Sequence, residues 1–203
     1  MSSDAGFIVD VIPRGMGRVL DLGGNRGMLR SLLEQRGYHY INLDICHFEQ
    51  GEPSLLGDAH CLPFKSGSFD MVLSKDTLEH FINPWIAVSE VYRVLKNSGR
   101  FVVWVPFMHP FHETDYYRYS PLGLQYILRD FEILRFDSPL WVFTIFGIAT
   151  IELLKRVKLG VLASPLRRIC TWLDRCCTRN RKAPAAFCPA YRIVAQKMLT
   201  AKD

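Results

Sequence analysis

The sequence predicts an α/β fold in which helices pack on the faces of a parallel sheet. Strand and helix patterns alternate along the first two-thirds of the chain, as they do when helices connect parallel strands. The first predicted strand also runs directly into a glycine-rich turn. With 203 residues, of which 49% are hydrophobic and 22% charged, the chain has the size and composition of one folded domain.

The first elements follow from local patterns. Arg18 to Leu22 is a short apolar strand, and Gly37 is suited to end the helix that follows the glycine-rich turn. This helix is predicted from leucines that share one face: Leu29, Leu32 and Leu33. Three further strands are predicted from short apolar runs: Tyr38 to Ile45, Leu55 to Ala59, and Phe69 to Ser74.

Two later helices have clear start signals. Asn83 and Ser120 can each accept a hydrogen bond from the first turn of a helix, and a proline follows each of them, which suits the first helical position. Asn97 to Gly99 is predicted to be a turn. The remaining strands are predicted at Phe101 to Val105, Phe131 to Phe136, and Tyr191 to Met198.

Ser138 to Pro189 is predicted to be a helical insert between the last two strands of a single domain, residues 1–203. Its first part, Ser138 to Ile151, is uncharged but shorter than the roughly 20 residues that a helix needs to cross a bilayer. From Glu152 to Lys182, nine basic residues stand against two acidic ones, a net charge of +7. Two interpretations are open: residues 138–182 contact a membrane peripherally, or the insert is an apolar lid over a substrate pocket with a basic outer face.

Charge and cysteine usage bear on partners and compartment. The whole chain carries +5, so the part outside the basic segment is close to −2 by difference. We expect no nucleic-acid partner, because basic charge is not spread around the predicted catalytic body. The six cysteines have irregular spacings, and the first ten residues contain no long apolar run. We therefore expect a cytoplasmic protein with reduced thiols, lying against the inner membrane face if the insert binds lipid.

The strongest chemical signal is the turn after the first strand, Asp21-Leu22-Gly23-Gly24-Asn25-Arg26-Gly27. Glycines in such a turn let a nucleotide approach the backbone closely. A dinucleotide site needs the spacing G-x-G-x-x-G, so that a pyrophosphate rests on a helix N-terminus, and this turn lacks it. Asp21 would repel phosphate but attract the ammonium and sulfonium groups of S-adenosylmethionine (SAM). The turn therefore favours SAM over NAD.

Two more carboxylates follow predicted strands. Asp44 comes 23 residues after Asp21, where it can accept hydrogen bonds from both hydroxyls of a ribose. The same geometry would serve NAD, so Asp44 indicates a nucleoside without choosing the cofactor. Asp58 lies near the end of the third predicted strand, where a carboxylate can accept from an adenine amino group.

These residues belong to an ordered series of motifs: VLDLGGNRG, NLDI, GDAHCLPFKSGSFDMVLSKDTLEH and SEVYRVLKNSGRFVV. The series resembles the class I SAM-dependent methyltransferases, specifically the methyltransferase type 11 group, over about residues 17–137 and the last strand. The resemblance implies a Rossmann-like sheet of seven mostly parallel strands with an antiparallel terminal strand. It places Asp21 and Gly23 at the methionine moiety, Asp44 at the ribose, and Asp58 with Ala59 at the adenine. The further cofactor residues that it implies are Gly24, Asn25, Gly27, Ile45, Ser74 and Lys75.

One position departs from the family pattern. Asn25 stands where the family has a glycine. Asparagine tolerates the left-handed backbone conformation better than most residues, so the turn is still expected to form.

The methyl acceptor is expected beside the ends of the fourth and fifth strands. Methyl transfer requires an aligned acceptor, and a hydroxyl acceptor must also lose a proton. After the fourth strand, Lys75 and Asp76 can border the transferred methyl group, which makes Asp76 a catalytic candidate. His80 follows them and can contact the substrate or serve a structural role at a helix end.

The loop from Pro106 to Pro121 is rich in His, Tyr, Asp and Arg and leaves the carboxyl end of a central strand. It resembles the HxxxxDYYRYTP-like segment of methyltransferases associated with bacterial cell-surface polysaccharide synthesis. His112 is the first candidate for the general base and His109 the second. No further series of ligands accompanies these two histidines, so no metal is expected.

The same loop contains the candidates for substrate binding, and two interpretations of them remain open. Their side chains can hold a sugar or an anionic group by stacking and forked hydrogen bonds. Alternatively, Asp115 and Arg118 form a local ion pair and the tyrosines pack as a hinge. The residues concerned are Asp115, Tyr116, Tyr117 and Arg118.

The sequence therefore predicts a SAM-dependent enzyme that methylates an oxygen of a saccharide or glycan-linked metabolite and releases S-adenosylhomocysteine. A lipid or quinone methyltransferase is the alternative if the insert binds a membrane. A third hypothesis is a catalytically silent SAM-binding subunit that acts through a partner. An NAD-linked oxidoreductase is the remaining and weakest alternative.

Overall fold

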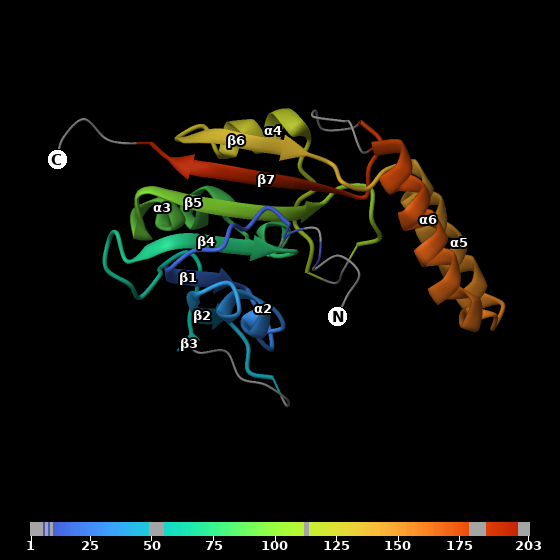
Figure 1. The fold of residues 1–203 in the computed structure, drawn as a ribbon, viewed down its shortest axis with the longest axis horizontal. Coiled ribbons are helices and arrows are strands. Elements are labelled where there is room, and N and C mark those ends of the chain that lie inside the picture. The colour runs from blue at the N-terminus through green and yellow to red at the C-terminus, as the bar shows by residue number, and fades with distance from the viewer. Residues whose placement is uncertain are drawn as a thin grey trace.

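The computed structural model describes residues 6, 8, 10–48, 55–111, 114–178 and 186–198, and a seven-stranded sheet forms its centre (Figure 1). The strands lie in the order β3-β2-β1-β4-β5-β7-β6. The pairs among the first five strands are parallel, whereas β7 runs antiparallel to both neighbours. This confirms the predicted fold class. The strands are β1 (Gly17–Leu22), β2 (Tyr38–Asp44), β3 (Leu55–Leu56), β4 (Phe69–Lys75), β5 (Leu95–Pro106), β6 (Phe131–Asp137) and β7 (Ala190–Lys197).

Helices cover both faces of the sheet because alternate residues of each buried strand point to opposite sides. On one face, Val19 of β1 packs in a cluster with Leu33 of α2 (Arg30–Glu34). On the other face, Leu20 of β1 packs with residues of α3 (Pro84–Val94) and α4 (Pro121–Ile127), including Val91 and Leu124. The edge where the parallel strands end remains available for a site.

The predicted helix starts are confirmed. The Asn83 Oδ1 atom accepts a hydrogen bond of 3.4 Å from the Ile86 N–H, and Pro84 occupies the first helical position of α3. The Ser120 Oγ atom accepts one of 3.1 Å from the Gly123 N–H at the start of α4. Each cap satisfies a backbone donor that has no partner within its own helix.

Two predicted elements need correction. The third strand was expected to reach Ala59, but β3 ends at Leu56, so Asp58 lies beyond the strand in the following loop. The turn predicted at Asn97 to Gly99 lies inside β5, as an irregularity of the pairing with β4. Ser98 has a φ of 59°, and this left-handed residue lets the strand bulge and then resume pairing at Arg100.

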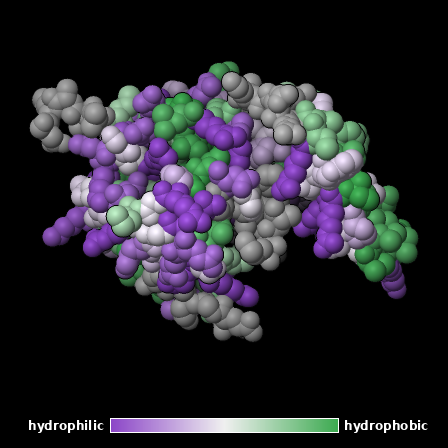
Figure 2. Space-filling model, viewed as in Figure 1, coloured by the Kyte–Doolittle hydropathy of each residue, from purple (hydrophilic) through white to green (hydrophobic). Residues whose placement is uncertain are grey.

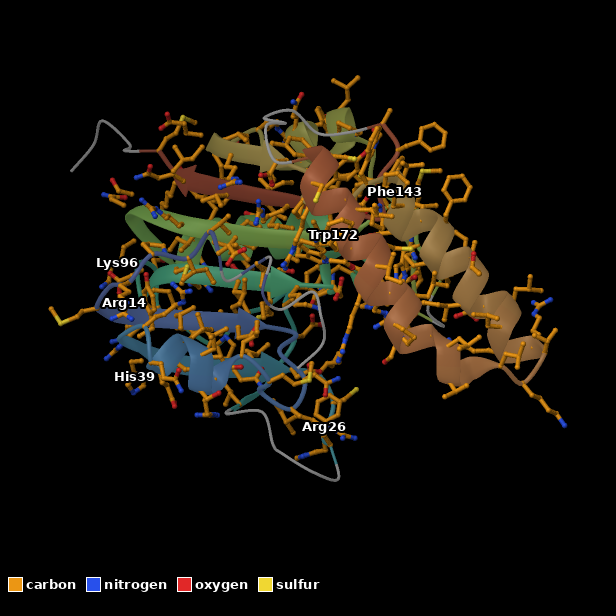
Figure 3. All side chains as sticks on the ribbon, turned by 45° about the vertical axis from the view of Figure 1, so that its right-hand side comes forward. Arg14, Arg26, His39, Lys96, Phe143 and Trp172 are labelled. Atoms are coloured by element: carbon orange, nitrogen blue, oxygen red, sulfur yellow. The ribbon has the colours of Figure 1, made fainter. Side chains whose placement is uncertain are left out.

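The insert between β6 and β7 contains α5 (Val142–Arg156), the short 3-10 helix η2 (Gly160–Leu162) and α6 (Ala163–Thr178). The two long helices pack side by side, with Phe143 on α5 and Trp172 on α6 (Figure 3). They contact each other closely, because a Cβ atom on Gly147 would lie 2.9 Å from the Cys170 Sγ atom. These elements form a helical hairpin that extends away from the sheet, and hydrophobic surface gathers towards its far end (Figures 1 and 2). Among the residues described, no helix combines the length and apolar character needed to cross a membrane.

Candidate cofactor and acceptor site

The glycine-rich turn follows β1 at the edge where the parallel strands end. Gly23, Asn25 and Gly27 have φ values of 69°, 52° and 72°, so Asn25 adopts the left-handed conformation that its position requires. A Cβ atom on Gly23 would lie 2.2 Å from the Thr77 Cγ2 atom, and one on Gly24 would lie 2.6 Å from the Asp21 Cγ atom. Side chains at either glycine would therefore force the turn away from the strand ends.

Asp21 lies under this turn, almost completely buried. Its Oδ2 atom accepts a 2.6 Å hydrogen bond from the Tyr40 hydroxyl. Burial raises the pKa of Asp21 to about 6, although the hydrogen bond from Tyr40 and the charge of Lys75 oppose that rise. The predicted position of Asp21 at the methionine moiety remains a prediction. Its contacts here are with the turn and with Tyr40, a partner that the sequence did not reveal.

Asp44, at the end of β2, joins the second strand to the turn. Its Oδ2 atom accepts a 2.9 Å hydrogen bond from the Asn25 N–H, and its Oδ1 atom accepts one of 3.1 Å from the Cys46 N–H. The Asn42 side chain, not predicted as a site residue, donates a 2.7 Å hydrogen bond to the Asn25 carbonyl. Ile45 follows with an exposed side chain. The second strand therefore fixes the position of Asn25 through both its backbone N–H and its carbonyl.

Asp58 is held by a residue that sequence reasoning missed. Its Oδ1 atom accepts a 2.9 Å hydrogen bond from the His60 N–H and lies 2.6 Å from the His60 Nδ1 atom. The backbone and side-chain hydrogen bonds from His60 lower the pKa of Asp58, so the carboxylate stays ionised at neutral pH. The spacing Asp-x-His was a local signal for this contact, because a carboxylate readily accepts from the backbone two residues on. Ala59 between them is buried.

The end of β4 brings three predicted residues together. Ser74 is fully buried, and its hydroxyl has no hydrogen-bond partner in the part of the chain that the structure describes. Lys75 and Asp76 form an ion pair with each other. Asp76 has a φ of 51°, and its N–H donates a 2.9 Å hydrogen bond to the Trp104 carbonyl. The left-handed backbone at Asp76 ends the strand where it meets the turn.

A cavity of about 260 Å³ lies between this strand end and the helical hairpin. Lys75, Asp76 and His109 contribute to it from the sheet side, and α5 and α6 provide most of the opposite side. Its remaining lining is mainly apolar: Met28, Trp104, Pro106, Leu140, Thr144, Gly147, Ile148, Ile151, Arg167, Cys170, Thr171, Pro189 and Ala190. The sequence predicted that the insert could cover a pocket, but it did not identify these lining residues.

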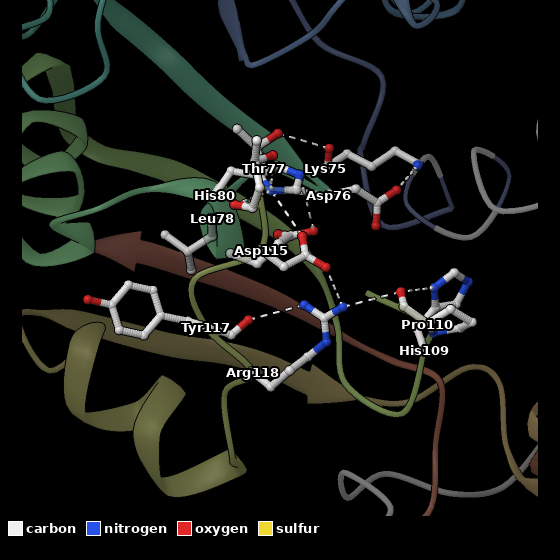
Figure 4. A network of polar contacts seen from close by, with 12 residues as sticks. Lys75, Asp76, Thr77, Leu78, His80, His109, Pro110, Asp115, Tyr117 and Arg118 are labelled. Atoms are coloured by element: carbon white, nitrogen blue, oxygen red, sulfur yellow. Dashed lines mark hydrogen bonds and ion pairs between the residues drawn. The ribbon is translucent and has the colours of Figure 1, made fainter. Parts of the chain in front are cut away.

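The loop after β5 is tied to the 3-10 helix η1 (Leu78–His80) by an ion-pair network (Figure 4). The Arg118 Nη2 atom lies 2.5 Å from the Asp115 Oδ2 atom, and the His80 Nδ1 atom lies 3.0 Å from the Asp115 Oδ1 atom. The Asp115 side chain is 1% exposed. This geometry is that of the local ion pair, one of the two interpretations that the sequence left open.

The two tyrosines of the loop differ. Tyr116 is exposed, whereas Tyr117 stacks on Tyr119 with ring centroids 5.7 Å apart and donates a 3.0 Å hydrogen bond to the Ile82 carbonyl. Both backbone N–H groups donate to the Glu79 carbonyl, at 2.9 Å and 3.2 Å. None of Asp115, Tyr116, Tyr117, Arg118 and His80 lines the cavity.

Glu79 is the buried centre of this region and was not predicted as a site residue. Its side chain is fully buried, and burial raises its pKa to about 8, with further contributions from Asp76 and Asp115. Glu79, His80 and Asp115 also place potential metal-ligand atoms within 4.8 Å of one another. Arg118 already neutralises Asp115, however, and a protonated Glu79 is a poor ligand. The arrangement therefore fits an internal polar network better than a cation site.

Two of the three candidate catalytic residues line the cavity. His109 is exposed and lines the cavity, and its Nδ1 atom lies 3.3 Å from the Pro110 carbonyl. Asp76 lines the same cavity. His112, the first candidate, lies outside the described residues.

Comparison with known proteins agrees with this geometry. Residues 20–103, which contain the glycine-rich turn and the β4 strand end, match the sequence model of a family described as "Methyltransferase domain". This part of the chain is therefore similar to that family. An uncharacterised methyltransferase of Mycobacterium sp. (strain KMS) is 31% identical over 112 residues, which span 50% of this chain. The match spans 44% of that relative, so the chain covers less than half the length of the curated protein.

Solved structures share the overall fold of the chain. The YcgJ protein of Bacillus subtilis superposes with a TM-score of 0.62 at 18% identity, covering 98% of this chain and 100% of that one. The [4+2]-cyclase SpnF superposes with a TM-score of 0.63 at 17% identity, covering 97% and 81%. At these identities the likeness shows the class I methyltransferase fold alone.

The cofactor implied by the match to the methyltransferase family is SAM, and the residues present fit it. Gly23 and Gly24 of the turn approach neighbouring side chains too closely to be replaced, which keeps the backbone free of side chains where a nucleoside would pass. Asp44 and Asp58 present carboxylates along the same edge. Acids without a phosphate-binding G-x-G-x-x-G turn suit a cationic nucleoside that carries no phosphate.

Proposed function

We propose that the protein transfers the methyl group of SAM to a hydroxyl oxygen of an acceptor bound in the cavity beneath the hairpin. One observation carries this proposal. Lys75 and Asp76 line the cavity, and the adjacent Thr77 contacts the glycine-rich turn, so the acceptor space is continuous with the proposed cofactor site. In-line transfer requires this adjacency of the two binding sites.

The chain's own groups have separate roles in this mechanism. Asp44 would hold the ribose, Asp58 the adenine amino group, and the glycine-rich turn the methionine moiety. Bound SAM supplies an activated methyl on its sulfonium. This chemistry would join the methyl group to the acceptor oxygen, with S-adenosylhomocysteine as the leaving group and a methyl ether as the product. A side chain of the cavity must accept the hydroxyl proton.

Asp76 and His109 are the described candidates for that proton acceptor, because both line the cavity. Lys75 forms an ion pair with Asp76 at the edge of this cavity. His112 remains a sequence-based candidate for the same role. Proton acceptance by a positioned side chain typically contributes about 10²–10⁴-fold to the rate.

Two acceptor classes are proposed. The resemblance of the loop after β5 favours a saccharide or glycan-linked metabolite. The cavity favours the alternative, a lipid or quinone hydroxyl, because its lining is mainly apolar and polar groups occur chiefly where Lys75, Asp76, His109 and Arg167 contribute. An acceptor with an apolar body and a polar reacting group satisfies both, whereas nucleic acid fits neither.

The free cysteines support the compartment expected for such an enzyme. All six cysteines are described and none is paired in a disulfide. This supports placing the protein in the cytoplasm, where thiols remain reduced.

Isotope-labelled SAM tests the proposal on two acceptor panels, one of sugars and sugar nucleotides and one of hydroxylated lipids and quinols. Calorimetric titration with S-adenosylhomocysteine measures cofactor binding separately. Methyl transfer to the lipid panel would support the lipid or quinone acceptor that the cavity favours. Methyl transfer to the sugar panel would support the saccharide acceptor that the resemblance of the loop favours. Failure to bind S-adenosylhomocysteine at millimolar concentration would refute the proposal.

We propose as a second function a SAM-binding protein that does not transfer the methyl group. The fold neighbour SpnF is described as a [4+2]-cyclase, so this fold occurs with chemistry other than methyl transfer. Tight binding of S-adenosylhomocysteine without transfer to either panel would favour the catalytically silent, SAM-binding subunit.

A further inference from the structure

The helical hairpin divides into two parts with different surroundings. Near the sheet, Gly147, Ile151 and Cys170 are buried and line the cavity. Residues 153–162, here called the hairpin tip, contain the last turn of α5 and the 3-10 helix η2. No residue of the hairpin tip lines the cavity. A lid function therefore explains the base of the hairpin but not its tip.

The hairpin tip exposes large apolar side chains. Val161 is 82% exposed and Leu153 is 61% exposed. Figure 2 shows hydrophobic surface over this end of the molecule. Apolar residues exposed singly are common, but a contiguous group usually marks an interaction site. The members of the group are Leu153, Val157, Leu159, Val161 and Leu162.

The charged side chains that follow Glu152 around this group have one sign. Residues 153–173 contain no aspartate or glutamate. Glu152, just before the tip, forms an ion pair of 2.6 Å with Lys155. Asp174, just after this stretch, is buried, and its carboxylate accepts from the first backbone N–H groups of α5. The basic residues of the stretch are Lys155, Arg156, Lys158, Arg167 and Arg168.

We propose that the hairpin tip is an interfacial contact for an anionic lipid bilayer. The exposed Leu and Val side chains would enter the boundary between headgroups and acyl chains, and the basic side chains would bind lipid phosphates. The observations favour this occupant over two others. A second copy of the chain would bring the same positive charge against the tip, and a nucleic acid would gain nothing from the exposed aliphatic groups.

The contact goes beyond methyl transfer and does not depend on it. It also assigns the two interpretations of the insert to different parts of the hairpin, the lid to the base and the membrane contact to the tip. The two parts are connected, because α5 runs without a break from Ile148 in the cavity lining to the tip. An amphipathic acceptor dissolved in the bilayer would then lie near the opening that the hairpin base covers.

Flotation of the full chain with lipid vesicles tests the proposal. We expect flotation with vesicles of phosphatidylcholine containing about 30% phosphatidylglycerol and little with phosphatidylcholine alone. The double variant Lys155→Gln/Arg156→Gln should bind roughly fivefold more weakly for each charge removed. Binding should also fall in about 1 M salt, where charges are screened beyond roughly 3 Å.

A pair of matched variants tests the apolar part. Val161→Asp should abolish flotation, whereas Leu122→Asp should float like the unmodified chain, because Leu122 is 77% exposed but lies on α4, away from the tip. Equal flotation of both variants, or binding of the unmodified chain that ignores lipid charge, would overturn the proposal. The proposal would also be overturned if neither protein floated with vesicles and light scattering showed that the unmodified chain forms a dimer that Val161→Asp does not form. Binding of S-adenosylhomocysteine by Val161→Asp should be unchanged, which keeps this test independent of the enzymatic one.

Discussion

The carboxylate of Asp174, in α6, caps the N-terminus of α5. Its Oδ2 atom accepts hydrogen bonds of 2.8 Å and 2.9 Å from the Trp141 and Thr144 N–H groups, and its Oδ1 atom accepts one of 3.1 Å from Phe143. The first turn of a helix attracts negative charge, and Asp174 is fully buried there. The two helices of the hairpin are therefore joined by a charged cap as well as by apolar packing.

Replacing Asp174 by alanine should loosen the hairpin. The loss of hydrogen bonds to a buried carboxylate should lower the free energy of unfolding by ~1.5–3 kcal/mol, measured by urea denaturation. Asp174→Asn keeps part of the cap and should lose less. If both variants unfold at the same urea concentration as the unmodified chain, the cap does not hold the hairpin.

Asp44→Ala should weaken the binding of S-adenosylhomocysteine by ~1.5–3 kcal/mol, because the carboxylate can no longer accept from the ribose hydroxyls. Calorimetric titration measures the change. The same variant loses the hydrogen bonds to the Asn25 and Cys46 N–H groups, so its thermal unfolding should be recorded in parallel. Unaltered affinity in a folded variant would remove Asp44 from the cofactor site.

Cofactor affinity should depend on pH through Asp21. Because burial raises its pKa to about 6, Asp21 is largely protonated below that pH and anionic above it. Binding of a ligand that carries an ammonium group should therefore strengthen as the pH rises, by at most about tenfold per unit below pH 6, and then level off. Asp21→Asn still accepts from Tyr40 and should show a flat profile. A matching rise in this variant would assign the pH dependence to another group.

Asp76→Asn tests the proton acceptor without disturbing the backbone, since asparagine tolerates the left-handed φ of 51°. If Asp76 accepts the hydroxyl proton, turnover should fall by ~10²–10⁴ while the affinity for S-adenosylhomocysteine stays nearly constant. His109→Ala and His112→Ala, assayed alongside, identify the base by which variant shows this loss. Full activity of Asp76→Asn would show that Asp76 does not accept the hydroxyl proton and has only the structural role of ending its strand.

Glu79 should make stability fall as the pH rises from about 4.5 to about 8. Its pKa in the folded protein is about 8, above the ordinary value of 4.5, so its contribution to stability is complete below 4.5 and is lost as the pH rises through 8. The free energy of unfolding should fall by at most about 1.4 kcal/mol per pH unit between pH 4.5 and 8, or about 3–5 °C in Tm per unit, and this decline should level off above pH 8. Glu79→Gln should be less sensitive to pH over this range. An identical decline from pH 4.5 to 8 in both proteins would contradict the buried, protonated state of Glu79.

Features with local causes could be predicted from the sequence. The caps at Asn83 and Ser120, the left-handed Asn25 and the series of strands each depend on residues only a few positions apart. The antiparallel terminal strand followed from the resemblance rather than from any pattern in its own residues, and its position between β5 and β6 was not predicted.

Features that join distant segments could not be predicted. Asp174 was one of two acids in a basic segment, and nothing nearby in the sequence shows that it caps a helix that starts more than thirty residues earlier. The same limit applies to the burial of Glu79 and to the contact between Tyr40 and Asp21, which exists only once β1 and β2 pair. Asp115 and Arg118 are close in sequence, but their orientation away from the cavity depends on how the loop packs against η1.

The hairpin leaves and re-enters the sheet through two strands that are direct neighbours. Asp137 at the end of β6 pairs in register with Arg192 of β7, and their side chains form a buried ion pair of 2.7 Å. The two ends of the insert therefore meet at a fixed junction that a short loop could equally well close. The helices at this junction can lengthen, shorten or be replaced without altering the edge that would hold the nucleoside, so the surface that the hairpin presents can diverge while that edge stays unchanged.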